Sequence, residues 1–267
     1  MEEAREIFEE AVNIVLKAWT EESIEHNSER WQIPFPYKDG HRGWEMAPWT
    51  KKLGAHGEVG SEGELRRISV VPSPYTKPHP PVFVASNASQ RTVEYAGSNG
   101  FIPAYFSKSD TVANFGPSYI QKAREAGYNF APGQNQAIVR MPRIADSCAE
   151  AREHIASYDG MIFKHFYQSF LPIAMREKTN INENTTYNDL VDPMINTGLF
   201  MAGNTSEIRD QFVAQWKHLP AEYVILIYHY AQQPKESVIK NLKLFMEEVK
   251  PALDELTDYP EYRNVAE

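Results

Sequence analysis

The sequence predicts an α/β fold with a parallel sheet, and the main observation is the alternation of strands and helices along the chain. After one N-terminal helix and a long loop, a strand-like segment followed by a helical segment occurs four times. This alternation is typical of parallel strands joined by crossover helices. No Gly-x-Gly-x-x-Gly motif follows a strand, which argues against a classical dinucleotide-binding fold. The alternation alone does not decide between a barrel and a doubly wound sheet.

The clearest strand–turn–helix unit lies in residues 78–100. A proline-rich approach leads into residues 82–85, a β-branched and aromatic run that is typical of a buried strand. Residues 90–98 then read as a helix that an Asn-Gly pair ends. The small polar turn between them carries Ser86 and Ser89 at a helix N-terminus, where backbone N–H groups suit a phosphate or another anion. The alternative is that these two serines only cap the helix.

The other elements are predicted from the same patterns. Residues 2–19 form an amphipathic helix with acidic residues in its first turn. Residues 20–64 and 160–200 show no regular periodicity, and we interpret both as long insertions that are lid candidates. Further strands are predicted at 65–71, 101–106, 136–141 and 223–228, and further helices at 109–126, 146–158, 205–219 and 237–248.

Composition indicates a globular chain without a membrane span. The 267 residues have a mean hydropathy of −0.51, and no apolar stretch is long enough to cross a bilayer. The acidic N-terminus is unlike a signal peptide, and the single Cys148 excludes an internal disulfide, so we expect a cytoplasmic protein. We interpret Cys148 as a packing residue rather than a nucleophile. A net charge of −9 with scattered basic residues argues against nucleic acid as a partner.

The sequence contains no recognisable metal-binding pattern. His26, His41 and His56 fall in the long loop at irregular spacing, without the His-Glu-x-x-His arrangement of zinc enzymes. We therefore expect no metal site.

An ordered series of segments resembles the C-terminal part of the luciferase-like monooxygenases. The matching segments are RISVVPSPYTKPHPPVFVASNASQRTVEYAGSNGF, MAGNTSEIRDQF, AEYVILIYHY and LKLFMEEVKPAL. The resemblance extends from residue 2 to about residue 255 and is weaker in the two insertions. No single motif is highly specific, and it is their order that carries the resemblance.

The resemblance implies a single TIM (β/α)₈ barrel domain over residues 1–267, with the site at the C-terminal ends of the strands. Only the second half of such a barrel, four βα units, fits into this chain. The helix at residues 2–19 stands where the family's fourth helix begins. We therefore expect a fragment of a longer protein, and the alternative is a true half-barrel whose open strand edges need a partner.

For the cofactor, the resemblance implies reduced FMN (FMNH₂), which activates O₂ to oxygenate a small organic substrate. In the family, the turn after the fifth strand lies against the flavin phosphate. This position makes Ser86, Asn87 and Ser89 candidate phosphate ligands, although Asn87 stands where the family frequently has a hydroxyl residue.

Three further residues are candidates because they lie at strand ends of the predicted catalytic face. His229 follows the last strand and is the catalytic candidate, as a hydrogen-bond donor to flavin or substrate or as a general acid or base. Tyr105 is a candidate for the wall of the flavin site, together with Phe106, or for packing. Arg140 is a candidate anion-binding residue.

The expected partners are the organic substrate, O₂ and a separate flavin reductase, and a homo-oligomer is expected. Two alternatives stay open, namely a non-catalytic half-barrel that pairs with itself or with an N-terminal half, and a deazaflavin-dependent oxidoreductase on the same scaffold. The substrate cannot be inferred from this sequence, because substrate-selecting residues lie mostly in loops and in the missing half.

Overall fold

The computed structural model describes residues 2–86, 89–170, 181–228 and 232–257. Contacts divide the chain into two compact units, Met1–Pro81 and Val82–Glu267. Whether the two units form one domain over residues 1–267, as the sequence predicts, stays a prediction. Each unit is treated by itself below.

The first unit contains the predicted N-terminal helix and a largely irregular segment. Helix α1 (Glu2–Thr20) confirms the prediction for residues 2–19. The irregular segment holds the short antiparallel pair β1 (His26–Asn27) and β2 (Gln32–Ile33) and the helix α2 (Ala47–Leu53). The sequence reading missed α2, which is too short to show a helical period and has a proline in its first turn.

The strand predicted at residues 65–71 does not join the parallel sheet. Within it, Leu65 and Ile68 make only isolated antiparallel bridges to other segments of the first unit. The apolar residues of this segment thus pair with loops around them, and the prolines that follow lack the N–H groups a longer ladder requires.

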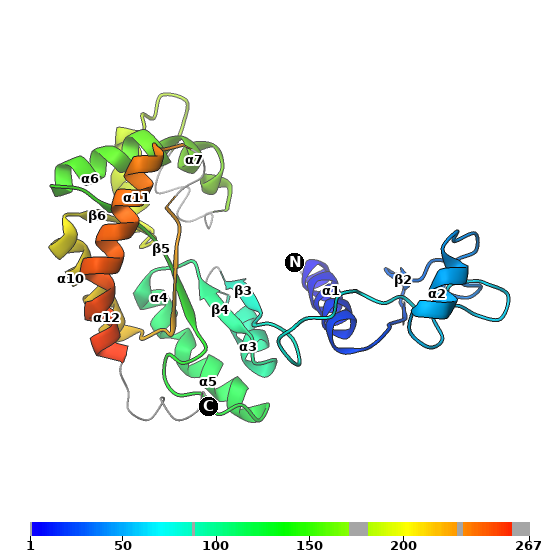
Figure 1. Cartoon of the computed structure of the whole chain (residues 1–267). Coiled ribbons are helices and arrows are strands. Elements are labelled where there is room, and N and C mark those ends of the chain that lie inside the picture. Colours follow the sequence, from blue (N-terminus) through cyan, green and yellow to red (C-terminus); the bar gives the residue numbers. More distant parts are fainter. Residues whose placement is uncertain (1, 87–88, 171–180, 229–231, 258–267) are drawn as a thin grey trace. The chain divides into compact units, whose positions relative to one another are not determined.

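The second unit has a five-stranded parallel sheet, visible in Figure 1 as arrows between the surrounding helices. The strands are β3 (Phe83–Ser86), β4 (Ile102–Tyr105), β5 (Ala137–Ile144), β6 (Phe200–Gly203) and β7 (Tyr223–Leu226). Strand β3 pairs with β4 and β4 with β5. The first half of β5 pairs with β7 and its second half with β6. Parallel pairing confirms the α/β prediction, whereas the described residues form no closed barrel.

Strand β6 is the one strand of the five-stranded sheet that the sequence reading missed. Its four residues are fully buried and pair with Met141–Ile144 of β5. The segment contains no β-branched residue and ends in glycine, so local composition does not mark it as a strand. Conversely, β7 was expected to be deeply buried but is only half-buried along its length.

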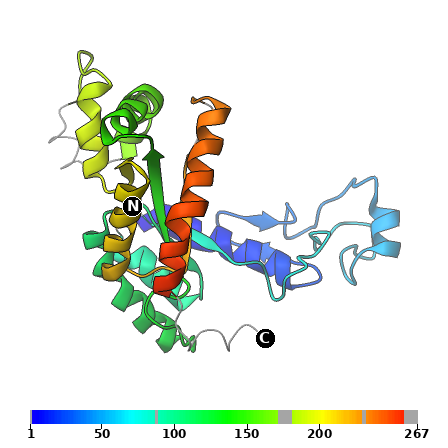
Figure 2. The same cartoon turned by 60° about the vertical axis from the view of Figure 1, so that its left-hand side comes forward.

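Helices join and flank the strands of the sheet. The α-helices are α3 (Gln90–Ser98), α4 (Ser109–Ala113), α5 (Phe115–Glu125), α6 (Cys148–His154), α7 (Gly160–His165), α9 (Val191–Asn196), α10 (Thr205–His218), α11 (Lys235–Leu244) and α12 (Lys250–Thr257). Five-residue π-helical turns, η1 (Ile155–Asp159) and η4 (Phe245–Val249), follow α6 and α11. Short 3₁₀ turns are η2 (Tyr167–Phe170) and η3 (Asn188–Leu190). Figure 2 shows β5 as the long strand beside α11 and α12.

Several helix ends follow the predicted pattern, and two differ from it. Helix α3 spans the predicted residues, and Asn204 caps α10 with a complete capping box to Glu207. Helices α4 and α5 lie within the helical stretch predicted at residues 109–126. Helix α6 begins at Cys148 rather than at the predicted residue 146, and its cap is Ser147, whose Oγ accepts the Glu150 N–H. The last helical segment runs without interruption from α11 through η4 into α12, and it therefore continues past the predicted end at residue 248 and past Pro251.

Candidate functional site

The candidate site begins at the carboxyl end of β3, where Ser86 is the last residue of the strand. Ser86 pairs in register with Tyr105 of β4. Its side chain is only 1% exposed, and its Oγ atom has no hydrogen-bond partner among the residues that the structure describes. An unsatisfied buried hydroxyl costs free energy, so such groups in native proteins generally have a ligand, a water or a role in function.

Helix α3 begins four residues later, at Gln90, directly after Ser89. Ser89 is the N-cap in extended conformation and is exposed, but its side chain makes no capping hydrogen bond. The first-turn amides of a helix have no acceptor within the helix and carry its positive dipole end. The sequence alternative, in which both serines serve as helix caps, therefore lacks the hydrogen bonds that capping requires. Asn87 lies outside the described residues.

Tyr105 lies on the same face of the sheet as Ser86. Its hydroxyl donates to the Gln136 Oε1 at 2.8 Å, and the side chain is 1% exposed. Burial raises the pKa of the Tyr105 hydroxyl well above its ordinary value, with a smaller contribution from Tyr119. This placement favours the packing alternative for Tyr105, and its role in walling a flavin stays a prediction.

Arg140 occupies the next strand on that face and is completely buried. Its Nε donates to the Gln215 Oε1 at 2.6 Å, and one terminal nitrogen donates to the carbonyl of Ser107, just past the end of β4. Burial lowers the pKa of the guanidinium to about 10, which leaves it charged at neutral pH. Ser86, Tyr105 and Arg140 thus lie on one face of three consecutive strands. His229 lies outside the described residues.

A second polar group, which the sequence reading missed, lies at the far end of β5. Arg143 forms a bidentate ion pair with Asp159, with Nε to Oδ2 at 2.8 Å and a terminal nitrogen to Oδ1 at 2.6 Å. Both side chains are at most 3% exposed. The signal in the sequence was a charged residue inside an apolar strand, which requires a partner when buried. Nothing in the sequence pointed to Asp159 as that partner.

This ion pair connects to the segment that follows β7. The Gln232 Nε2 donates to the Asp159 Oδ1 at 3.1 Å, and the Gln233 side chain donates to the Tyr228 carbonyl. The Tyr228 hydroxyl is buried and has no hydrogen-bond partner within the described part of the chain, and burial raises its pKa. The Arg143–Asp159 pair is thereby linked to the segment that follows β7 through the hydrogen bond to Gln232.

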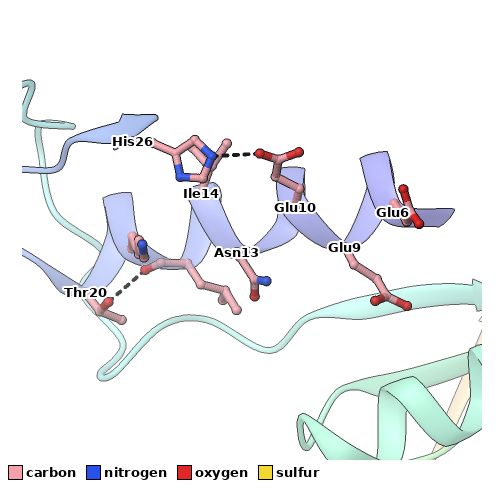
Figure 3. Close-up of a pocket in the computed structure, with 9 residues that line it drawn as sticks. Glu6, Glu9, Glu10, Asn13, Ile14, Thr20 and His26 are labelled. Carbon is pink, nitrogen blue, oxygen red and sulfur yellow. Dashed lines mark hydrogen bonds and ion pairs between the residues drawn. The ribbon is translucent and has the colours of Figure 1, made fainter. Parts of the chain in front are cut away.

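The first unit contains a groove of about 540 Å³ along α1, shown in Figure 3. The His26 Nε2 lies 2.8 Å from a Glu10 carboxylate oxygen at its rim. The groove is lined by Glu6, Glu9, Glu10, Asn13, Ile14, Leu16, Lys17, Thr20 and His26. Within the part of the chain that the structure describes, no group of three or more His, Cys, Asp or Glu side chains is placed to hold a metal. We assign no ligand to this groove.

Glu10 in this groove is expected to titrate below the ordinary glutamate pKa. Hydrogen bonds from Ser28 and then His26 hold its pKa down. A lowered carboxyl pKa stabilises the fold above the ordinary value, and this stabilisation is lost as pH falls through the folded value. Carbon-detected NMR titration of Glu10 would measure the shift, and Ser28→Ala should raise the pKa. An unchanged Glu10 pKa in that variant would show that the hydrogen bond is not its cause.

No helix among the described residues is long and apolar enough to cross a membrane.

Comparison with known protein families identifies the class of protein. The family model of the luciferase-like monooxygenases matches residues 1–223. This match covers most of the chain, and the chain therefore belongs to that family. A search of curated proteins found no match.

Two solved structures with a similar fold are monooxygenases. The oxygenating constituent of 3,6-diketocamphane monooxygenase from Pseudomonas putida, solved with FMN, is 19% identical with a TM-score of 0.63. It is matched over 93% of this chain and 63% of its own length. Monooxygenase RslO1 from Streptomyces bottropensis is 16% identical with a TM-score of 0.62, over 94% of this chain and 62% of its own. At these identities the likeness concerns the fold, and the chain spans less than two thirds of either structure.

Proposed function

We propose that this chain belongs to an enzyme that uses reduced FMN and O₂ to oxygenate a small organic substrate. The observation that carries the proposal is the orphaned, buried Ser86 hydroxyl beside the N-terminus of α3, in a member of the luciferase-like monooxygenase family. A separate flavin reductase would supply the reduced cofactor. The chain spans less than two thirds of the similar structures, so the activity is proposed for the whole protein.

The described residues fit the phosphate end of a flavin. Ser86 has a buried hydroxyl without a hydrogen-bond partner among the described residues, and the Ser89 hydroxyl makes no capping hydrogen bond to α3. The N-terminus of α3 adds the positive end of the helix dipole. Arg140 adds a buried positive charge two strands away. An anion bound here would therefore meet hydrogen-bond donors in a region of favourable electrostatic potential.

In this proposal the cofactor supplies the activation of O₂, and the protein supplies binding, orientation and exclusion of water. Ser86 and Ser89 hold the phosphate, with Asn87 as a further ligand from its place in the turn. Residues 20–64 and 160–200 are the proposed lids. His229 is the proposed residue for a hydrogen bond or proton transfer at the reacting end, on the basis of its sequence position.

Ser86→Ala should weaken FMN binding by roughly 10-fold to 100-fold, the equivalent of one hydrogen bond to a charged group. Riboflavin lacks the phosphate, and its affinity should not change. Fluorescence titration of the chain with each flavin measures both constants. Ser98→Ala is the matched control, because it makes the same change at the exposed opposite end of α3.

The comparison of the two flavins separates a phosphate ligand from a structural residue. A variant that loses affinity for FMN and riboflavin equally would place Ser86 in the packing of the site rather than at the phosphate. A wild-type chain that binds the two flavins with equal affinity would contradict the phosphate assignment as a whole.

A further inference from the structure

The carboxyl ends of β5 and β7 carry buried polar side chains that the proposed phosphate site does not use. Arg143, near the end of β5, forms the ion pair with Asp159, and both side chains are at most 3% exposed. Tyr228, just past the end of β7, is 8% exposed. Because the sheet is parallel, this group lies at the same edge as Ser86, and ligand sites of α/β proteins lie at this edge.

Arg143 keeps hydrogen-bond donors that no described residue accepts. A guanidinium has five N–H groups. The Arg143 Nε and one terminal nitrogen each donate once to Asp159, and the other terminal nitrogen donates to the Pro142 carbonyl. Two N–H groups therefore have no acceptor among the described residues. Buried donors without an acceptor are costly unless a ligand or a water supplies one.

The Tyr228 hydroxyl is a further donor near this guanidinium. It has no hydrogen-bond partner among the described residues. Burial raises the pKa of the hydroxyl, and the nearby Arg143 charge opposes part of this rise, so the hydroxyl stays protonated at neutral pH. The two groups are also held by consecutive residues, because Gln232 donates to Asp159 and Gln233 donates to the Tyr228 carbonyl.

Asp159 orients Arg143 and compensates its charge. Its two carboxylate oxygens accept from the Nε and from a terminal nitrogen of Arg143, which fixes the plane of the guanidinium. Asp159 is the last residue of the π-helical turn η1. Such turns are rare and occur frequently at functional sites. The arrangement thus holds the two remaining Arg143 donors in a fixed direction.

The chemistry of these groups restricts the ligand that they can bind. The unsatisfied groups of Arg143 and Tyr228 are all donors, so the ligand must supply an acceptor. A carboxylate or phosphate would bring a second negative charge beside Asp159 in a buried site, which is unfavourable. A carbonyl oxygen accepts two hydrogen bonds without adding a charge.

We propose that Arg143 and Tyr228 bind the carbonyl oxygen of the organic substrate, which is an uncharged carbonyl compound. This inference rests on the proposed function, because it assigns the substrate class of that enzyme. The flavin ring also carries carbonyl oxygens, so the test must separate the two sources.

Cyclohexanone labelled with carbon-13 at its carbonyl is the probe, and its resonance reports hydrogen bonding directly. On binding to the wild-type chain, the carbonyl signal should move downfield. Tyr228→Phe should weaken binding by about 3-fold to 10-fold, the equivalent of one neutral hydrogen bond, and should reduce the movement of the signal. Its urea midpoint should stay unchanged or rise, because the hydroxyl makes no hydrogen bond to a described residue.

Matched controls use both the protein and the ligand. Tyr223→Phe makes the same change at the amino end of β7 and should bind cyclohexanone as the wild type does. Methylenecyclohexane has the same shape without the oxygen and should bind equally to the wild type and to Tyr228→Phe. Arg143→Met combined with Asp159→Leu should also lose the downfield movement of the carbonyl signal.

Three results would overturn the proposal. The first is a wild-type chain that binds cyclohexanone no more tightly than methylenecyclohexane. The second is a Tyr228→Phe variant that loses affinity for FMN and riboflavin but not for cyclohexanone, which would assign the site to the flavin ring. The third is a lower urea midpoint with equal loss of all ligands. A wild-type chain that binds cyclohexanone through these residues, but no flavin, would support the site and contradict the proposed function.

Discussion

Replacing Asp159 by alanine is expected to lower the free energy of unfolding of the second unit by about 3–5 kcal/mol. The physical reason is that Arg143 would keep its charge in a site that is 1% exposed, without the carboxylate that now accepts two of its hydrogen bonds. Gln232 would lose an acceptor as well. Urea denaturation followed by circular dichroism measures the change.

Two further variants separate the buried charge from other effects. Asp192→Ala removes the partner of Arg152 in an ion pair at the surface, and its cost should stay below about 1 kcal/mol. Arg143→Met combined with Asp159→Leu removes both charges and should recover most of the stability lost in Asp159→Ala. If the double variant were as unstable as Asp159→Ala, the buried charge would not explain the loss.

Phe212→Ala is expected to destabilise the second unit by about 3–5 kcal/mol, the usual cost of a cavity left by a large buried aromatic ring. Phe212 in α10 is completely buried and packs edge to face on Phe245 of η4, with ring centroids 5.2 Å apart. The contact joins the helix before β7 to the helical segment after it. The change in the urea midpoint measures the effect.

Leu242→Ala is the matched control for the cavity, because Leu242 lies in α11 and is 45% exposed. Its cost should be well under that of Phe212→Ala, since removing an exposed side chain leaves no cavity. Equal losses in the two variants would mean that a cavity at Phe212 does not explain the loss of stability.

Local sequence correctly predicted those elements whose boundaries depend on residues close together in the chain. The amphipathic pattern before Thr20, the boundaries of α3 and the capping box at Asn204 each depend on residues within one or two turns of the chain. The alternation of these elements with apolar runs also predicted a parallel α/β arrangement. The series of motifs led to the luciferase-like family, which the family match confirms.

Local sequence failed where an element is defined by its neighbours. Strand β6 has weak strand propensity and exists because the second half of β5 offers it a partner. The segment at residues 65–71 has strong strand composition but finds only single bridges. Strand β7 reads as a buried strand and is half-exposed, because burial depends on what covers a strand and not on its own composition.

In the candidate site, too, some features follow from local sequence and others only from the tertiary structure. The sequence by itself determined that Ser86 and Ser89 stand between a strand and a helix, because turn residues and caps are local features. Only the tertiary structure decided that the Ser86 hydroxyl is buried without a partner, that Tyr105 and Arg140 lie on the same face, and that Arg143 meets Asp159. These facts join residues distant in the chain, and they arise from sheet register and packing, which no local pattern records.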